Sequence, residues 1–185
     1  LERYDEALEC YDFMLEENKK NPFAWNGKAG VLRKLKKYDE ALECVNNALF
    51  IDKDEGFLVT KGMIYGDQGK NKDAIRYYDD ALEIDKNCID ALFNKSIELD
   101  YLGEPEKALE CVSASLNLDK SNHDTWHTKG VILLHLKKHD ESLECFETSI
   151  KLNSNYAHVH NDKGRAFDHL ERYDEALECY DNALF

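Results

Sequence analysis

The strongest constraint on this chain is a repeat within its own sequence. The string YDEALEC begins at Tyr4, Tyr38 and Tyr173. Alignment on the small residue inside that string gives a series whose steps are 34, 33, 34, 34 and 34 residues. Its members are Ala7, Ala41, Ala74, Ala108, Ser142 and Ala176. A fixed period in the range of about 20–50 residues is typical of arrays in which each unit packs only on its neighbours. The chain is therefore predicted to be such an array.

Each repeating unit is predicted to consist of two helices. Apolar residues in 23–36 and in 39–51 recur every three or four positions, which is the period of a helix with one buried face. Neither segment alternates as a half-buried strand does. The two prolines, Pro22 and Pro105, fall at expected helix starts, where their missing N–H leaves no helical hydrogen bond unmade.

Small residues recur where the two helices of a unit must approach each other closely. In the first helix these residues are Ala29, Gly62, Ser96, Gly130 and Gly164. Larger apolar residues recur at a matching phase of the second helix. They are Tyr11, Val45, Tyr78, Val112, Phe146 and Tyr180. We interpret both series as the core of the array and not as a cofactor site.

A unit of 34 residues with these small residues resembles the tetratricopeptide repeat family, and the resemblance covers the whole chain. Trp25 and Trp126 match the tryptophan of the family pattern. The chain departs from the pattern where the family has leucine and every full unit here has lysine. Those lysines are Lys28, Lys61, Lys95, Lys129 and Lys163, and we expect each to bury its stem and extend its ammonium outward. The resemblance implies an all-α fold, a right-handed superhelical α-solenoid of antiparallel helix pairs.

The repeat phase predicts a single array over 1–185, with five full repeats and one leading helix. The leading half-repeat covers 1–19. The full repeats cover 22–53, 55–86, 88–120, 122–154 and 156–185. Residues 1–12 and 170–181 are identical, with the sequence LERYDEALECYD. Because this identity spans a whole number of repeats and the ends cut across the unit, we expect the chain to be a fragment of a longer array.

The charge balance indicates which partners to expect. The chain has 24 Lys and Arg against 38 Asp and Glu, a net charge of −14. Such a field repels a phosphate backbone, and no basic cluster offsets it, so nucleic acid is not an expected partner. No run of 18 apolar residues offers a membrane span. A protein or peptide, and a basic one in particular, is the expected partner.

Cysteine spacing predicts free thiols. Five of the six cysteines recur at one phase of the repeat, as Cys10, Cys44, Cys111, Cys145 and Cys179. Equivalent positions in stacked helix pairs lie about 10 Å apart, whereas a disulfide requires Cα atoms within about 7 Å. Free thiols favour a reducing, cytoplasmic location. The chain has no CxxC pair, and no metal site and no cofactor are predicted.

In the family, the first helices of the units line a concave groove, and the resemblance assigns the peptide-binding groove of this chain accordingly. The assigned residues are Asn26, Arg33, Lys34, Thr60, Met63, Asp67, Asp90, Phe93, Asn94, Ile97, Asp100, Tyr101, Asp124, His127, Val131, His135, His158, Asp162, Arg165 and Asp168. Six Asp against three Arg or Lys give this set a fixed charge of −3. Its histidines are interpreted as polar groove residues, with a metal site or a charge switch as alternatives.

The sequence holds no GxSxG, HExxH or Gly-rich phosphate loop, so no catalytic residue is assigned and the chain is not predicted to be an enzyme. The favoured function is a protein-interaction scaffold that binds a basic peptide or helix with apolar anchors in the groove. Two alternatives stay open. One is self-association of the chain end to end, and the other is the non-catalytic arm of a larger enzyme.

Overall fold

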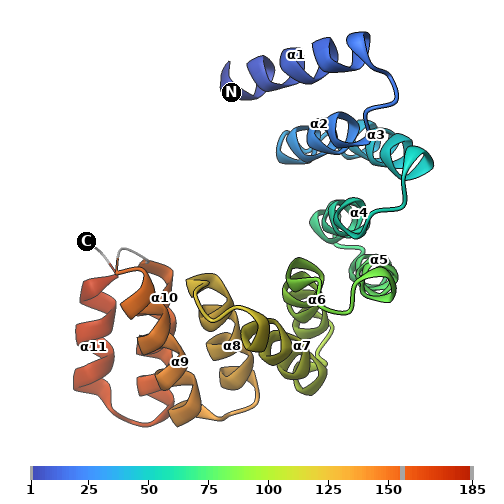
Figure 1. The fold of residues 1–185 in the computed structure, drawn as a ribbon. Coiled ribbons are helices and arrows are strands. Elements are labelled where there is room, and N and C mark those ends of the chain that lie inside the picture. The colour runs from blue at the N-terminus through green and yellow to red at the C-terminus, as the bar shows by residue number, and fades with distance from the viewer. Residues whose placement is uncertain (1, 155–156, 184–185) are drawn as a thin grey trace. The chain divides into compact units, whose positions relative to one another are not determined.

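A computed structural model describes residues 2–154 and 157–183, and all regular structure within these ranges is helical (Figure 1). The helices are α1 (Glu2–Glu17), α2 (Pro22–Lys34), α3 (Tyr38–Ile51), α4 (Glu55–Asp67), α5 (Asn71–Ile84), α6 (Ile89–Tyr101), α7 (Pro105–Leu118), α8 (His123–His135), α9 (His139–Leu152), α10 (Ala157–His169) and α11 (Tyr173–Asn182). They form two compact units, residues 1–94 and 95–185. Each unit is described by itself.

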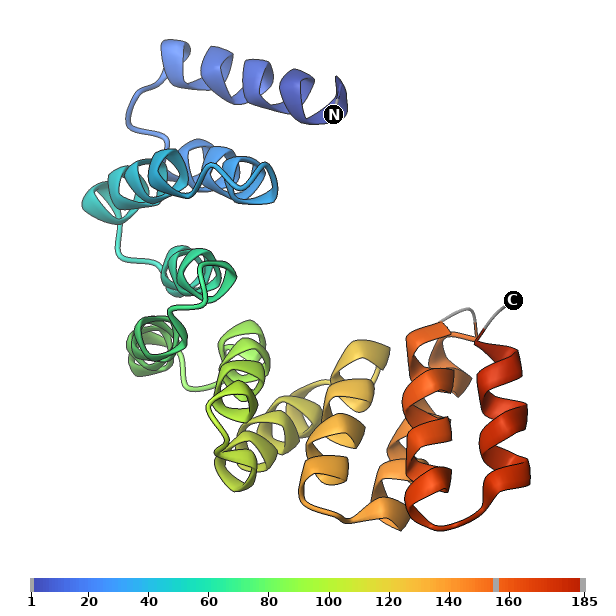
Figure 2. The ribbon, with the colours of Figure 1, turned by 180° about the vertical axis from the view of Figure 1, so that it is seen from behind.

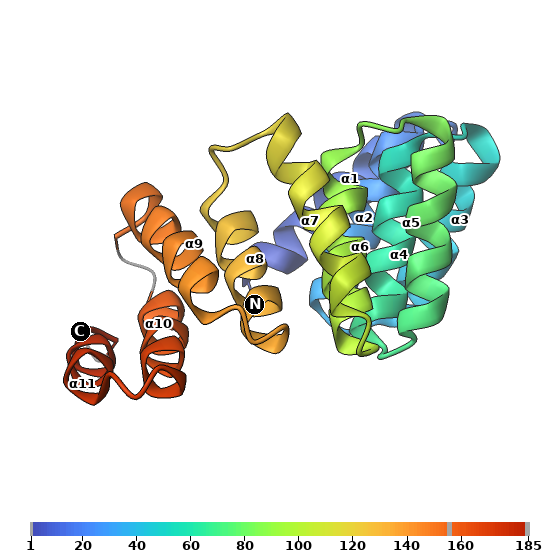
Figure 3. The same ribbon diagram turned by 90° about the horizontal axis from the view of Figure 1, so that it is seen from below.

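In the first unit, consecutive helices pair through short turns. Helix α2 packs against α3, and α4 runs alongside α5 (Figure 3). The pairs are joined by contacts of α3 with α4 and of α2 with α4, while α1 packs on α2. The core between the first two pairs contains Leu32, Val45, Phe57 and Ile64, which are almost fully buried. Helix α2 and helix α4 therefore share one face, and their partners α3 and α5 lie behind them.

The second unit repeats this arrangement. Helix α8 packs against α9, and α10 runs beside α11, orange and red in Figure 2. Contacts of α7 with α8 and of α9 with α10 join the successive pairs. Its core contains Leu143, Phe146, Val159 and Phe167. The predicted all-α solenoid of antiparallel helix pairs is confirmed, and no helix of the described residues is both long and apolar enough for a bilayer crossing.

The turn inside each helix pair has a left-handed residue at the same place in the repeat. Glycine occupies this place twice, as Gly69 and Gly103, with φ of 71° and 76°. Elsewhere the residue is Lys36, Lys137 or Glu171, with φ of 58–59°. A side chain in this conformation costs about 1 kcal/mol, but the turn lets backbone N–H groups reach the last carbonyls of the first helix.

The two kinds of helix begin differently. The first helices α2, α4 and α8 are capped by the side chains of Asn21, Asp54 and Asn122, each of which accepts a backbone N–H. Lysine or another long side chain precedes the second helices and makes no cap bond. Their aspartates, such as Asp39, lie in the first turn, so they act on the helix dipole and not as caps.

The lysines that replace leucine in the family pattern connect successive pairs. Lys28 of α2 forms an ion pair with Asp12 of α1. One repeat later, the Nζ of Lys61 lies 2.7 Å from Oδ1 of Asn46. The same geometry returns where the Nζ of Lys163 lies 3.2 Å from Oε1 of Glu147. These three lysines therefore reach the preceding second helix, which explains why a charged residue is tolerated at their packed positions.

Close approach within the pairs depends on glycine. A Cβ placed on Gly130 would lie 2.4 Å from the ring of Phe146, which is fully buried. The same conflict holds for Gly62 with Tyr78. Around Gly30, by contrast, no atom lies within 4 Å of the added Cβ. The aromatic ring of the second helix therefore occupies the space that a side chain on the first helix would need.

We expect Gly130→Ala to destabilise the fold by about 1–3 kcal/mol, because the buried ring of Phe146 has no room to move away. Gly30→Ala is the matched control. It should be neutral or stabilising by up to about 1 kcal/mol, since alanine favours a helix over glycine. Urea unfolding followed by circular dichroism measures both changes. Equal stability of the two variants would contradict the close-packing explanation.

All six cysteines are free, as the spacing predicted. Cys10 is exposed, whereas Cys44, Cys145 and Cys179 are buried. Burial raises the pKa of Cys44 and of Cys145 to about 11, although Lys28 and Lys129 respectively act in the opposite direction. The thiols of Cys44 and Cys145 therefore stay protonated well above neutral pH.

Because only the thiolate reacts with iodoacetamide, native protein at pH 8 should be alkylated at Cys10 well before Cys44 or Cys145. Peptide mass spectrometry over a time course measures the order. Labelling in urea is the control, because unfolding removes the burial and the three rates should converge. Labelling of Cys145 as fast as Cys10 in native protein would show that the pair α8–α9 opens readily.

Candidate functional site

The predicted groove residues lie on the first helices of each unit, and we call the side of these helices that carries them the first-helix face. In the first unit, Arg33 of α2 and Asp67 of α4 form an ion pair with Nη1 and Oδ2 3.0 Å apart. The guanidinium is mostly buried, so this cation joins successive first helices. Lys34, one residue on, is exposed and forms no ion pair with a described residue.

Three further predicted residues of α2 and α4, Asn26, Thr60 and Met63, are partly buried. Thr60 donates its hydroxyl to the carbonyl of Gly56, so it closes its own helical turn. The Oδ1 atom of Asn26 is buried and has no hydrogen-bond partner among the described residues. Met63 is partly buried. Val59, which occupies the same repeat position as Asn26, is buried in the core instead.

In the second unit, two histidine–aspartate contacts cross between successive first helices. The Nδ1 atom of His135 lies 2.9 Å from both carboxylate oxygens of Asp100. The Nε2 atom of His127 lies 2.8 Å from Oδ2 of Asp162. Asp162 also accepts a hydrogen bond of 2.9 Å from Arg165 of its own helix. The structure therefore brings these predicted groove residues together. Asp100 and Asp162 interact with side chains of the array itself.

Two acids on this face have perturbed surroundings. Burial pushes the pKa of Asp162 upward, but the hydrogen bonds from His127 and Arg165 outweigh it and hold that pKa below its usual range. Asp168 accepts a hydrogen bond from the hydroxyl of Tyr180. Burial and this bond together raise the pKa of Tyr180 to about 12. The carboxylate of Asp162 is therefore held ionised at neutral pH.

Helix α6 carries the largest apolar surface among the predicted residues. Phe93 and Ile97 are partly buried, while 76% of Tyr101 is exposed. Spacings of four residues place these three side chains on one face of the helix. Asp90 at its start is exposed. The side-chain amide of Asn94 donates to the backbone carbonyl of Asp90, at 2.8 Å.

The other predicted residues lie on α8 and α10. Val131 is partly buried, and His158 is exposed. Asp124 lies 3.4 Å from Nδ1 of His123. Leu134 occupies the same repeat position as Arg33 and Asp100, but it is buried. Within 2–154 and 157–183, no three His, Cys, Asp or Glu side chains come together as a metal site would require.

The repeat-to-repeat contacts were not predicted, although the sequence holds a signal for them. Arg33 and Asp67 are 34 residues apart, and Asp100 and His135 are 35 apart. Opposite charges at these separations fall on neighbouring first helices. A search for such pairs at one repeat length would have found them.

Comparisons with known proteins agree with this geometry. Three family models, each described as a tetratricopeptide repeat, match residues 1–55, 56–88 and 122–184. A comparison with curated proteins gives no match. Among solved structures, a crystal structure of MamA is 21% identical with a TM-score of 0.73, over 84% of this chain and 92% of that one.

Two further structures are similar. YrrB, described as a TPR protein with an unusual peptide-binding site, is 22% identical with a TM-score of 0.72, over 96% of this chain and 92% of that one. A chain of the APC/C hetero-tetramer Cut9–Hcn1 is 17% identical with a TM-score of 0.91, over 99% of this chain but 37% of that one. At such identities the likeness concerns the fold alone.

We expect Asp162→Asn to lower stability at pH 7 by about 1–3 kcal/mol, because it replaces a carboxylate that accepts two charge-assisted bonds. The folded pKa of Asp162 lies below the unfolded value of 3.8. This stabilisation is therefore present above about pH 4 and is lost as the pH falls through the folded pKa. Urea unfolding of both proteins at pH 7 and pH 3 measures the difference.

The control is Glu110→Gln, which removes an exposed carboxylate that forms no ion pair with a described residue. It should change stability little at either pH. A difference between wild type and Asp162→Asn that stays the same at both pH values would refute the role given to the ionised carboxylate.

Proposed function

Because the chain belongs to the tetratricopeptide repeat family, we propose that it is a non-catalytic interaction module whose first-helix face binds a protein or peptide. The ligand that fits this face is a basic peptide or helix with one or two large apolar side chains. The face of α6 carries this proposal. It combines the exposed ring of Tyr101 with the partly buried Phe93 and Ile97, and it begins at the exposed carboxylate of Asp90.

The internal pairs on this face favour a basic ligand. Arg33 and Arg165 are paired with Asp67 and Asp162 respectively, which weakens the attraction of either guanidinium for an acidic ligand. The face nevertheless keeps its fixed charge of −3, with six Asp against three Arg or Lys. Charge of this sign attracts Lys and Arg side chains, while apolar anchors control how long a complex lasts.

The fold supports an interaction role but does not identify the ligand. YrrB, which has the same fold, is described as having a peptide-binding site. That description concerns YrrB alone. It supports the class of function proposed here, and the residues of the site are argued from this chain.

Self-association is the second candidate. Helix α1 exposes 64% of Phe13, and helix α11 exposes 62% of Leu177. Large apolar side chains exposed on two helices would favour contact between copies of the chain. In this case, the first-helix face would have no role in assembly.

The proposed function predicts that Phe93→Ala with Tyr101→Ala abolishes most peptide binding, since each aromatic anchor contributes about 2 kcal/mol or more. An array of basic peptides with single Phe, Trp or Leu residues provides the probes. Tyr173→Ala is the control, because 60% of that tyrosine is exposed on a second helix outside the face. It should bind like wild type.

Charge should act differently from the anchors. Replacing Asp90 and Asp124 by Asn should mainly flatten the salt dependence of binding and leave the off-rate little changed. Equal binding of the array by wild type and the double aromatic variant would disprove the first-helix face model. If sedimentation then rose with concentration, and Phe13→Ser with Leu177→Ser abolished this rise, self-association would be the better explanation.

A further inference from the structure

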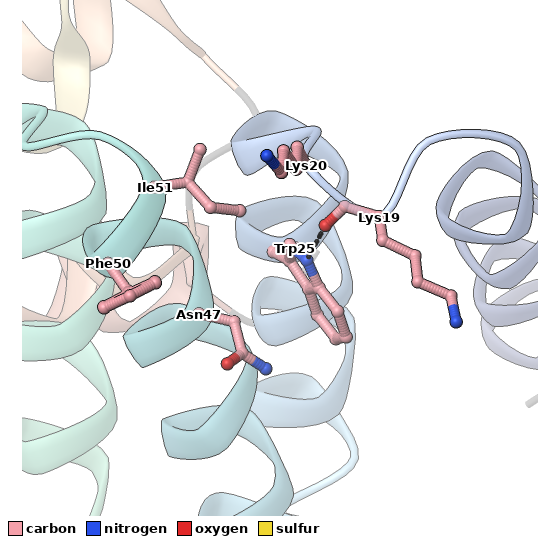
Figure 4. Close-up of a pocket in the computed structure, with 6 residues that line it drawn as sticks. All are labelled: Lys19, Lys20, Trp25, Asn47, Phe50 and Ile51. Carbon is pink, nitrogen blue, oxygen red and sulfur yellow. Dashed lines mark hydrogen bonds between the residues drawn. The ribbon is translucent and has the colours of Figure 1, made fainter.

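A recess of about 420 Å³ lies away from the predicted groove residues, and we call it the Trp25 recess (Figure 4). Its lining residues are Lys19, Lys20, Trp25, Asn47, Phe50 and Ile51. They come from the loop between α1 and α2, from the start of α2 and from the end of α3. The indole Nε1 donates a 3.0 Å hydrogen bond to the carbonyl of Lys19, which fixes the ring against the loop.

Phe50 is the residue that repeat packing does not explain. Its side chain is 91% exposed. At the same phase of the other copies the chain has Glu16, Glu83, Asn117, Lys151 and Phe185. The position is therefore polar in four of the five other copies, and in those four it is exposed. Here it places an aromatic ring next to Ile51 and across the recess from Trp25, so the three form one apolar patch (Figure 4).

The polar groups at the recess are positioned for a peptide. Lys20 lies beside the apolar patch, and Lys19 extends on the far side of the Trp25 ring (Figure 4). Neither ammonium forms an ion pair with a described residue. The side-chain amide of Asn47 has no hydrogen bond to a described residue either, so it offers a donor and an acceptor to a backbone.

The equivalent recess one repeat later has the opposite character. It encloses about 510 Å³ and is lined by Leu49, Lys53, Leu58, Asp80, Glu83 and Ile84. Leu58 stands in place of Trp25, and Glu83 stands in place of Phe50. One lysine there faces two carboxylates, whereas the Trp25 recess has two lysines and no acid in its lining. Shape recurs with the repeat, but the chemistry of the Trp25 recess does not.

We propose that the Trp25 recess is a second docking site, for an acidic peptide segment with one large apolar side chain. The apolar side chain would lie on Phe50, Ile51 and the Trp25 indole. A neighbouring carboxylate would pair with Lys20, and the peptide backbone would bond to Asn47. This ligand is opposite in charge to the one proposed for the first-helix face, so the two sites would not compete for one peptide.

Long-range and local electrostatics act in opposite directions at this site. The net charge of −14 repels an acidic peptide at a distance, and salt screens this repulsion. The contact with Lys20 is short and is screened less. Binding should therefore weaken with salt much less than the binding of basic peptides to the first-helix face.

Trp25 itself provides the readout. The chain has two tryptophans, so Trp126→Phe leaves Trp25 as the single indole fluorophore. The probe is a synthetic peptide with the core Glu-Phe-Glu-Leu between Gly-Ser ends, and Lys-Phe-Lys-Leu is its matched comparison. We expect the acidic peptide to change the Trp25 fluorescence with saturation, and the lysine peptide to leave it unchanged.

Substitutions then separate this site from its neighbours. Phe50→Glu, which introduces the residue found at this phase one repeat later, should weaken the acidic peptide by about ten-fold or more, and so should Lys20→Glu. Lys53→Glu, the same change in the equivalent recess, should have no effect. Tyr101→Ala should also have none, since it lies on the other proposed site. Circular dichroism confirms that each variant is folded.

Three results would overturn the proposal. They are an unchanged Trp25 signal at millimolar acidic peptide, an equal response to the lysine peptide, and full affinity in folded Phe50→Glu. A change in Trp25 fluorescence that depends on protein concentration without peptide would also overturn it, because the recess would then be a contact between copies of the chain.

Discussion

The close approach of a small residue on the first helix to a larger apolar residue on the second is the constraint on which the rest of this structure depends. At Gly62 and Gly130 the rings of Tyr78 and Phe146 fill the space of the missing side chain. This contact sets the distance between the helices of a pair. Because each pair packs only on its neighbours, that distance also sets where successive first helices lie. Interactions along the first-helix face, such as Arg33 with Asp67, follow from it.

The fold could be predicted from the sequence because its information is local and periodic. Helix pairs, their small residues and the free thiols all follow from a series that repeats every 33 or 34 residues. The left-handed turn was not predicted, since Lys36 and Glu171 give no local sign of the positive φ that Gly69 suggests. Tertiary packing of the two helices outweighs the preference of a single residue there.

The candidate site could be predicted less well. The position of a residue in the repeat indicates the helix face on which it lies, but not the side chains that it contacts on neighbouring helices. The ring of His127 contacts Asp162 on the next first helix, so it interacts within the array. Likewise, the phase that places Val59 on the same face does not show that it turns into the core. The Trp25 recess joins a loop to the ends of two helices, and no single periodic segment contains it. The burial of Val59 and the make-up of the Trp25 recess therefore follow only from the folded structure.

The identical segments 1–12 and 170–181 occupy two different environments. In α11, Tyr180 lies against Gly164 of the preceding first helix, whereas in α1 the equivalent Tyr11 lies against Gly27 of the following one. Asp12 also pairs with Lys28 of that following helix. Together the two copies display both halves of the contacts that an internal second helix makes. Genetic recombination between them would lengthen or shorten the array by whole repeats, and the junction would already contain compatible neighbours on each side.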